Sequence, residues 1–400
     1  MDQLYTDYLQ IIREVCTNSE KRHVFHGEKL KDLYRLSSEH FTVPFLLPYT
    51  APSDKLFFQI RQQTKMMMLH YYQIEQFTVH LTSLLKEHHI PCILLKGISL
   101  AAYYPTPELR KLGDVDLYIS DPDDLDKAKQ ILERNDFRPV DEVSDHHLTY
   151  QYTFPRTNRT YILELHFRIV GLYQYGPANQ IVNTVFSANA FQPFLQTIRN
   201  REYTVLPPTE SVFYMIHHML KHYLYSGFGI RLLCDFTLYL TRHKDEIDFD
   251  RIHNWCQESR ILHLYEIILE SCRLYLGLSE KIDPHIHYNA TDCEKFIEKI
   301  LSDGDVGKNE KNELVSSGSY DTVNWLTYFK EGHIQMKVRF PKLHKCALLW
   351  PVLWWITLVI FLHNTYRLRN TTFRQTLADF KKGNHDTRLI RIFDNDDKKD

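Results

Sequence analysis

The sequence predicts an α+β fold in which a small mixed sheet lies between helical N-terminal and C-terminal regions. Apolar residues recur at three- and four-residue steps up to residue 90 and again after residue 207, a spacing typical of helices. Between these regions, short apolar segments of strand length alternate with polar turns. With 400 residues, 44% of them hydrophobic and 24% charged, the chain has an ordinary globular composition and room for more than one domain.

Each part of this organisation follows from a local pattern. Residues 1–90 predict a helical N-terminal region that ends at Pro91, because proline cannot continue a helix. Residues 91–206 predict the core, with strands at 92–95, 115–119, 137–140, 148–154 and 161–167 and with helices at 98–104 and from 120 onward. Residues 207–300 predict a helical domain, 301–322 a mobile glycine-broken loop, and 323–400 a C-terminal region with a charged tail.

Charge and cysteine usage narrow the possible classes of protein. Lysine plus arginine number 48 against 50 for aspartate plus glutamate, so a long nucleic acid is the least favoured partner. The seven cysteines form no Cys-x-x-Cys pair, and the N-terminus has neither a basic segment nor an apolar run. We therefore expect a cytoplasmic protein whose cysteines are buried as small hydrophobic residues.

An apolar run over residues 346–362 leaves two interpretations open. It contains three tryptophans, has basic residues on both sides, and falls just short of the usual membrane-spanning length of about 18 to 20 residues. A buried C-terminal helix or a docking surface is favoured over contact with a membrane interface. An experiment is needed to separate the two.

Two aspartates open the strand predicted at 115–119. Asp114 and Asp116 are two residues apart, so in a strand their carboxylates point to the same face. Oxygen ligands of this kind suit Mg²⁺, and transfer of a nucleoside monophosphate from a nucleoside triphosphate uses two such ions about 3.5 to 4 Å apart. The pair therefore predicts a site for two Mg²⁺ ions and a nucleoside triphosphate donor.

A third carboxylate is expected from the strand predicted at 161–167. That strand is hydrophobic except at Glu164 and His166, which share one face. A carboxylate among apolar neighbours is costly unless a cation or strong hydrogen bonds compensate it. Glu164 is thus the best candidate for the third metal ligand, or for the base that helps to deprotonate the acceptor.

The segment between the first two strands offers groups for phosphate. Gly97 lets the backbone approach a phosphate closely, and Lys96 and Ser99 add a charge and a donor at the start of a short helix. Arg110 and Lys111 precede Asp114 and are expected to neutralise the β- and γ-phosphates.

Each of these signals has a structural alternative. An isolated Asp-x-Asp is more often a solvated strand edge, and Glu164 with His166 alone would be an ordinary salt-bridged pair. Their occurrence together and in this order is far more specific.

At these residues the sequence resembles the polymerase β superfamily of nucleotidyltransferases and, more narrowly, a large bacterial family of uncharacterised nucleotidyltransferases. The resemblance is carried by Leu95-Lys-Gly, Tyr104-Pro, Arg110, Gly113-Asp-Val-Asp-Leu, Glu164-Leu-His and Arg231-x-x-x-Asp235. It implies a small mixed sheet, magnesium-dependent use of a nucleoside triphosphate, and Asp114, Asp116 and Glu164 as the acidic triad.

Further polar residues are candidates for the cleft. His217, His218 and His222 fall on a predicted helix, where His218 and His222 have zinc-capable spacing but lack a third ligand nearby, so a structural or cleft role is preferred. Arg231 and Asp235 form either an intrahelical ion pair or a wall of the nucleotide pocket. His166 is a cleft candidate as well. His146 and His147 precede a strand, and the sequence leaves open whether they face the sheet edge or the cleft.

The favoured hypothesis is a magnesium-dependent nucleotidyltransferase whose acceptor is undefined: a small molecule, a sugar, a protein side chain or a tRNA end. One alternative is a catalytically inactive relative that binds a nucleotide or serves as a scaffold. Another is a membrane-associated enzyme of surface-polymer synthesis that docks through residues 350–362.

Overall fold

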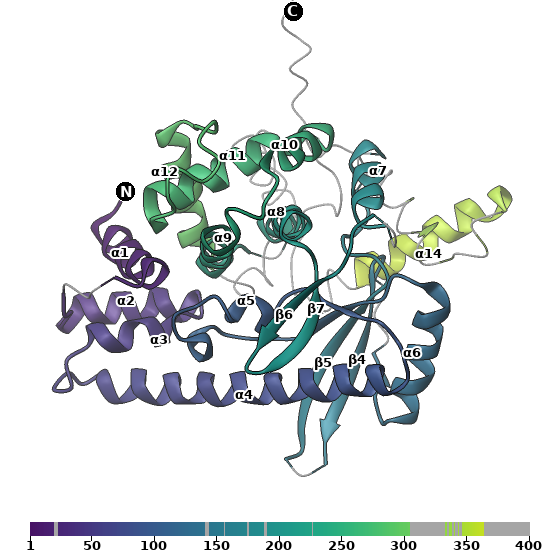
Figure 1. The fold of residues 1–400 in the computed structure, drawn as a ribbon, viewed down its shortest axis with the longest axis horizontal. Coiled ribbons are helices and arrows are strands. Elements are labelled where there is room, and N and C mark those ends of the chain that lie inside the picture. Colours follow the sequence, from purple (N-terminus) through teal and green to yellow (C-terminus); the bar gives the residue numbers. More distant parts are fainter. Residues whose placement is uncertain are drawn as a thin grey trace, which may run out of the picture.

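The computed structural model describes residues 1–19, 23–140, 144–155, 157–173, 176–187, 190–225 and 227–304, and further on 333, 336–337, 340, 343 and 346–363. A seven-stranded mixed sheet forms the centre of this part of the chain, with helices before and after it (Figure 1). The predicted α+β fold class is therefore confirmed. The expectations of a loop at 301–322 and of a charged tail concern residues that lie almost entirely outside the described ones.

The N-terminal helices are α1 (Gln3–Thr17), α2 (Gly27–Glu39), α3 (Val43–Leu46) and the 31-residue α4 (Phe57–Glu87). The core contains β1 (Ile93–Leu94), α5 (Ile98–Ala101), β2 (Val115–Tyr118), α6 (Pro122–Arg134), β3 (Arg138–Pro139), β4 (His147–Phe154), β5 (Arg159–His166), α7 (Gly176–Val185), β6 (Phe194–Ile198) and β7 (Arg201–Val205). The later helices are α8 (Pro208–Tyr225), α9 (Ile230–His243), α10 (Phe249–Glu258), α11 (Leu262–Ser271), α12 (Ala290–Asp303) and α14 (Trp350–His363).

The order of strands across the sheet is β3-β4-β5-β2-β1-β7-β6. Strands β2 and β5 are parallel, and Asp116 is the register partner of Glu164. Strand β1 lies antiparallel to β2 and parallel to β7. The two central strands that carry the predicted acids are therefore direct neighbours. Asp116 of β2 and His166 of β5 are hydrogen-bonded to each other, although 50 residues separate them in the sequence.

The two faces of the sheet pack against different layers. Leu117, Leu163 and Leu165 belong to a core that includes Phe77 of α4, which runs along the sheet in Figure 1. Because neighbouring residues of a strand point to opposite faces, the alternate positions Asp116, Glu164 and His166 face the other way. That face is the one covered by α8, as Tyr214 of this helix lies close to Lys96 and Asp116.

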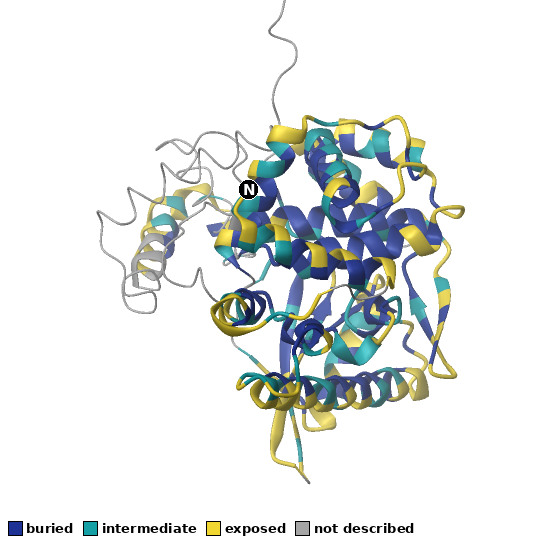
Figure 2. Ribbon diagram, turned by 90° about the vertical axis from the view of Figure 1, so that its left-hand side faces the viewer, coloured by how far each residue is buried: buried dark blue, intermediate teal, exposed yellow. Residues whose placement is uncertain are grey.

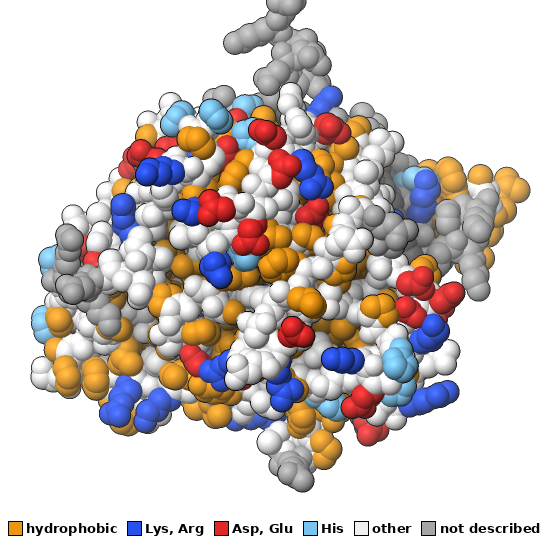
Figure 3. Space-filling view, viewed as in Figure 1, with side chains coloured by type: hydrophobic (Ala, Val, Ile, Leu, Met, Phe, Trp, Pro, Cys, Tyr) orange, Lys and Arg blue, Asp and Glu red, His pale blue; other side chains and the backbone are white. Residues whose placement is uncertain are grey.

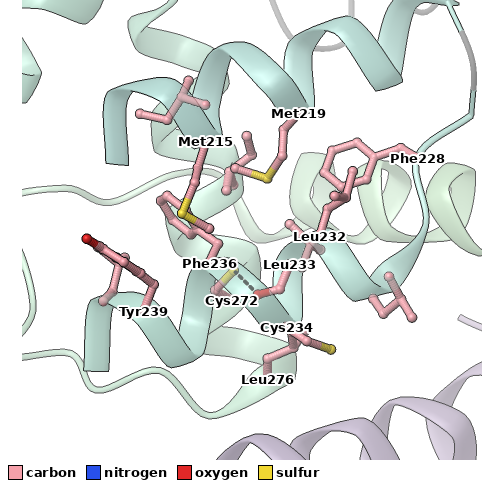
Figure 4. Close-up of a cluster of buried hydrophobic side chains, with 14 of the residues drawn as sticks. Met215, Met219, Phe228, Leu232, Leu233, Cys234, Phe236, Tyr239, Cys272 and Leu276 are labelled. Carbon is pink, nitrogen blue, oxygen red and sulfur yellow. Dashed lines mark hydrogen bonds between the residues drawn. The ribbon is translucent and has the colours of Figure 1, made fainter. Parts of the chain in front are cut away.

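A second and larger core joins the N-terminal helices to α8 through α12. Figure 2 shows buried residues along the inside of these helices and exposed residues on their outer sides. In Figure 4, Met215 and Met219 of α8 pack over Leu232 and Phe236 of α9. This packing gives α8 and α9 a rigid position opposite the sheet.

The cysteines behave largely as expected. Five of the seven (Cys16, Cys234, Cys256, Cys272 and Cys293) are buried, whereas Cys92 is half-buried and Cys346 is exposed. All seven are free thiols.

The structure adds elements that the sequence pattern did not predict. The hairpin of β6 and β7 extends the sheet beyond β1. Helix α7 comes between β5 and that hairpin in the sequence. The predicted helix at 98–104 is shorter and ends at Ala101.

The apolar run at 346–362 becomes the short turn Ala347–Leu349 followed by α14. Several of its large side chains are exposed, among them Trp355 at 67% and Leu348 at 89%. The sequence favoured either a buried C-terminal helix or a docking surface, and burial does not hold for these side chains, whereas a docking surface stays a prediction. Helix α14 forms the apolar projection at the right of Figure 3. On the rest of the visible face, acidic and basic side chains are interspersed. Within the described ranges, no helix combines the length and apolarity needed to cross a membrane.

Candidate active site

The acidic side chains of β2 and β5 converge as the alternation of the two strands predicts. Asp116, which is 1% exposed, has its Oδ1 atom 3.1 Å from His166 Nε2, and this nitrogen is 3.4 Å from Glu164 Oε2. One ligand atom from each of these three residues lies within 4.8 Å of the others. Asp114 precedes β2 and is more exposed than Asp116.

Lys96 connects the two aspartates. Its ammonium lies 3.2 Å from Asp116 Oδ1 and 3.8 Å from Asp114 Oδ2. Burial alone would lower the pKa of Lys96, but the charges of Asp114 and Asp116 outweigh this effect and raise it. Lys96 is therefore a charged partner of the acids, and its expected contact with phosphate stays a prediction.

The carboxyl groups of the site differ in their proton affinity. Burial, followed by the nearby charge of Asp114, raises the pKa of Asp116 to about 6. Burial would also raise the pKa of Glu164, but the hydrogen bond from His166 and the charge of Lys96 overcome it and lower that pKa. Perturbed carboxyl groups that face a cleft are typical of functional sites.

Gly97 turns the chain directly after Lys96. It has φ +79° and ψ −119°, a backbone conformation that side chains rarely adopt, and the space around its missing Cβ is open. Glycine is therefore favoured at position 97 by the positive φ of the backbone, and not by a lack of space for a side chain. Ser99, by contrast, is buried on the other side of the short helix α5, where its carbonyl accepts a hydrogen bond from Gln196 at 2.9 Å.

Arg110 forms a buried ion pair, while its predicted binding of phosphate stays a prediction. It is 4% exposed, and its Nε and Nη2 atoms each donate to a carboxylate oxygen of Asp235 at 2.7 Å. Tyr104 donates to the same carboxylate at 2.7 Å, and Arg110 Nη1 reaches the Gly97 carbonyl at 3.4 Å. A guanidinium held in this bidentate way supports the Gly97 turn from behind, and Asp235 is the acceptor that fixes it.

A cavity of about 410 Å³ opens above the acids. Asp114, Glu164, Gly97 and the side chains of α8 and α9 line it. Its basic residues are Lys96, Arg110, Lys111, Lys221 and Arg231, and Arg231 also donates to the Lys111 carbonyl at 3.2 Å. A volume of this size accommodates a small-molecule ligand.

Several lining residues were not identified from the sequence. Tyr214 and Lys221 lie on α8 and flank the candidate His218, so the helical repeat around that histidine was a usable signal. Phe41 is in the left-handed region with φ +54°, and Lys111 Nζ lies 3.1 Å from its ring centroid. Nothing local in the sequence connects Phe41 with the core.

The α8 histidines fall on different sides of that helix. His218 lines the cavity, and its pKa is lowered by burial and by the neighbouring His222, whose ring centroid is 4.5 Å away. His217 points into the core and bonds Tyr173 Oη at 2.7 Å. No third ligand joins His218 and His222 among the described residues, so a metal site there is not supported.

The acids fit hard divalent cations chemically. The second carboxylate oxygen of Asp116 is buried and has no hydrogen-bond partner among the described residues. Burying such an atom is costly unless a ligand uses it. Asp114, Asp116 and Glu164 together would supply the oxygen ligands that Mg²⁺ requires.

Comparisons with known proteins give a family but little more. Among solved structures, an antigenic nucleotidyltransferase-like protein from Paracoccidioides brasiliensis is similar over 55% of this chain and 96% of its own, at 14% identity and a TM-score of 0.32. A search of curated proteins finds no match. A family model described as an uncharacterised nucleotidyltransferase matches residues 31–277, more than half of the chain and all of the cavity described above. The protein therefore belongs to this family of uncharacterised nucleotidyltransferases.

Proposed function

We propose that this protein is a magnesium-dependent nucleotidyltransferase that transfers a nucleoside monophosphate from a nucleoside triphosphate to a small hydroxylated acceptor. The observation that carries the proposal is the placement of Asp116 and Glu164 as register partners on adjacent parallel strands, with Asp114 two residues before Asp116, and with Asp114 and Glu164 lining a cavity. A purely structural role does not account for the neighbouring acids Asp116 and Glu164 when one buried carboxylate oxygen of Asp116 has no partner among the described residues.

Asp114, Asp116 and Glu164 would hold the Mg²⁺ ions. When bound, these ions activate the acceptor oxygen and neutralise the triphosphate. The acceptor oxygen attacks the α-phosphorus, the bond to the bridging oxygen breaks, and pyrophosphate leaves. Glu164 is positioned to take up the acceptor proton, since it faces the cavity and is held by His166.

The rest of the cavity supplies contacts for the donor. Lys111, Lys221 and Arg231 line it and provide positive charge for the phosphates. Arg110 contributes indirectly, because its bond to the Gly97 carbonyl fixes the turn beside which the phosphates would lie. Positioning and charge stabilisation of this kind supply most of the catalysis in phosphoryl transfer.

The size and charge of the site favour a small acceptor. A cavity of about 410 Å³ is at the low end for ligand sites, so it leaves little room beyond a nucleotide and a compact second substrate. The net charge of −2 gives no general attraction to a polynucleotide. A sugar, a small alcohol or a single protein side chain fits these limits best.

The test is incubation of the full-length protein with each of the four nucleoside triphosphates, Mg²⁺ and a fractionated cell extract, followed by mass spectrometry. A product heavier than an extract component by one nucleoside monophosphate, with pyrophosphate released, supports the proposal. The product must disappear with Asp114→Asn and persist with Asp126→Asn, a control at an exposed aspartate of α6. Binding of a triphosphate without any product would instead identify an inactive nucleotide-binding relative.

A further inference from the structure

Three histidines converge beside the acids on the same face of the sheet. His147 is the first residue of β4, His146 directly precedes it, and His166 is the last residue of β5 and the register partner of His147. Their ring centroids lie 4.4, 5.5 and 5.2 Å apart, and all three residues are buried. One ring nitrogen of each lies within 4.8 Å of the others, which is a spacing that a single ion can bridge.

An oxygen atom holds the Nδ1 nitrogen of each ring. These oxygens are Asp145 Oδ1 at 2.7 Å from His146, Ser144 Oγ at 3.2 Å from His147, and the Arg168 carbonyl at 3.3 Å from His166. Histidines that bind metals almost always use one nitrogen as the ligand and bond the other to an oxygen in this way. The three Nε2 atoms are therefore the candidate ligand atoms, and a bound ion would replace the hydrogen bonds that His166 Nε2 makes with Asp116 Oδ1 at 3.1 Å and His146 Nε2 makes with Lys221 Nζ at 3.1 Å.

The backbone fixes the carboxylate that orients His146. Asp145 Oδ2 accepts a hydrogen bond from the Leu172 amide at 2.7 Å. A Cβ atom at Gly171 would lie only 3.1 Å from Asp145 Oδ1 and 3.3 Å from His146 Nδ1, so the chain passes close against this pair. The His146 ring is consequently held in one orientation.

The Nε2 atoms of these histidines lie close to carboxylate oxygens or to an ammonium group. His166 Nε2 lies 3.1 Å from Asp116 Oδ1 and 3.4 Å from one oxygen of Glu164, and His147 Nε2 lies 3.8 Å from the other oxygen of Glu164. Lys221 Nζ lies 3.1 Å from His146 Nε2, which accepts its hydrogen bond because Nδ1 donates to Asp145. Since Lys221 is exposed, its ammonium can turn to solvent when another cation takes this place.

We propose that His146, His147 and His166, with an oxygen of Glu164, form a second metal site that binds a divalent transition-metal ion such as Zn²⁺. Three imidazole nitrogens and one carboxylate oxygen form a ligand set that Zn²⁺ accepts, whereas Mg²⁺ prefers oxygen ligands alone. The site goes beyond the proposed transferase function, because ion binding here does not require turnover. Glu164 and His166 place it directly next to the acids.

The test is titration of the full-length protein with Zn²⁺ by calorimetry and with Co²⁺ by visible absorption, in the presence of excess Mg²⁺. We expect one ion per chain and the strong visible bands of four-coordinate Co²⁺. His147→Asn should weaken binding by about 100-fold or more, and Asp145→Asn, which removes only the orienting charge, by about 10- to 100-fold. His285→Asn, the same change at an exposed histidine, should have no effect.

A gain of affinity protects the test against variants that simply fail to fold. Lys221→Met removes the competing ammonium and should tighten binding about tenfold, the equivalent of one hydrogen bond to a charged group. Asp114→Asn should abolish nucleotide transfer and retain Co²⁺ binding, so the two proposals fail separately. Absence of Co²⁺ binding, displacement of Co²⁺ by Mg²⁺, or unchanged binding in His147→Asn would overturn the second site.

Discussion

Two charge clusters, Arg110 with Asp235 and Lys96 with Asp114 and Asp116, lie on either side of the Gly97 turn and are built in opposite ways. In the first, Arg110 and Asp235 satisfy each other with two hydrogen bonds of 2.7 Å. In the second, Asp114 and Asp116 share the ammonium of Lys96 at 3.8 and 3.2 Å, His166 bonds one oxygen of Asp116, and the other oxygen of Asp116 has no partner among the described residues.

The contrast separates a structural ion pair from the proposed metal site. A buried ion pair with ideal geometry is strongly destabilised by the loss of one partner. A crowded group of acids with too few donors stores unfavourable energy that a bound cation would relieve. Both clusters are charged and buried, so it is the satisfaction of their hydrogen bonds that distinguishes them.

The largest expected effect comes from the crowded cluster. Asp116→Asn preserves the shape of the side chain but removes a metal ligand, so we expect the rate of nucleotide transfer to fall by about a thousandfold or more. The free energy of unfolding at pH 7 should not decrease, because a costly buried carboxylate is lost as well. Product formation followed by mass spectrometry and urea unfolding measure the two quantities. A variant that keeps its activity would refute the assignment.

The structural pair should respond in the opposite sense. Asp235→Asn leaves the Arg110 guanidinium buried without its countercharge, so the free energy of unfolding should fall by about 3–5 kcal/mol. The double variant Arg110→Met with Asp235→Leu should recover much of that loss, which urea unfolding of all the variants would reveal. As a control, Lys127→Met at an exposed pair should leave stability unchanged. Independent, additive losses would show that the pair is not coupled.

Gly97 and Gly113 offer a matched comparison within the cavity wall. Both line the cavity and have open space around the Cβ position, but only Gly97 has a positive φ. Gly97→Ala should therefore cost about 1–3 kcal/mol, as loss of stability or of triphosphate binding, whereas Gly113→Ala should cost much less. Thermal unfolding and calorimetry with a triphosphate distinguish the two. Equal effects would mean that backbone strain is not the reason for glycine at position 97.

His217 extends the comparison to pH. Burial lowers its pKa from 6.5 to about 3, so the unfolded chain binds its proton first as the pH falls. Its contribution to stability is complete above pH 6.5 and is lost below it, at about 1.4 kcal/mol per pH unit toward pH 3. His217→Asn should therefore give a flatter dependence of unfolding free energy on pH between 5 and 6.5. Parallel curves for the two proteins would contradict this.

Local patterns predicted the acids well because their geometry is local. Asp114 and Asp116 share a face by strand alternation alone, and Glu164 was identifiable as the single acid in an apolar strand. That these acids form a metal site stays a prediction. What could not be predicted is the partner of Arg110, since Asp235 lies 125 residues further along the chain. An arginine near an Asp-x-Asp pattern looks the same from sequence whether it binds phosphate or another helix.

The missed hairpin has a similar cause. Strands β6 and β7 have five residues each, and they are stable as strands because β7 pairs with the distant strand β1. No local sequence pattern reveals such a pairing. The histidines at 146, 147 and 166 were visible individually, but their convergence follows from the register between β4 and β5. The register between two strands depends on the turn that joins them and on the packing of their side chains against the rest of the protein, so it cannot be predicted from either strand alone.

The pairing of β1 with β7 bears on the order in which the molecule is assembled. Strand β1 has only two residues, and one of its neighbours, β7, ends at Val205, more than a hundred residues after the Lys96-Gly97 turn. Asp235, which fixes that turn through Arg110, comes later still. During synthesis, the acids of β2 and β5 can therefore pair well before the turn beside them is held in place. A ribosome-bound chain that ends before α9 would contain the acids of β2 and β5, but its Lys96-Gly97 turn would lack the Arg110–Asp235 pair that holds it in place.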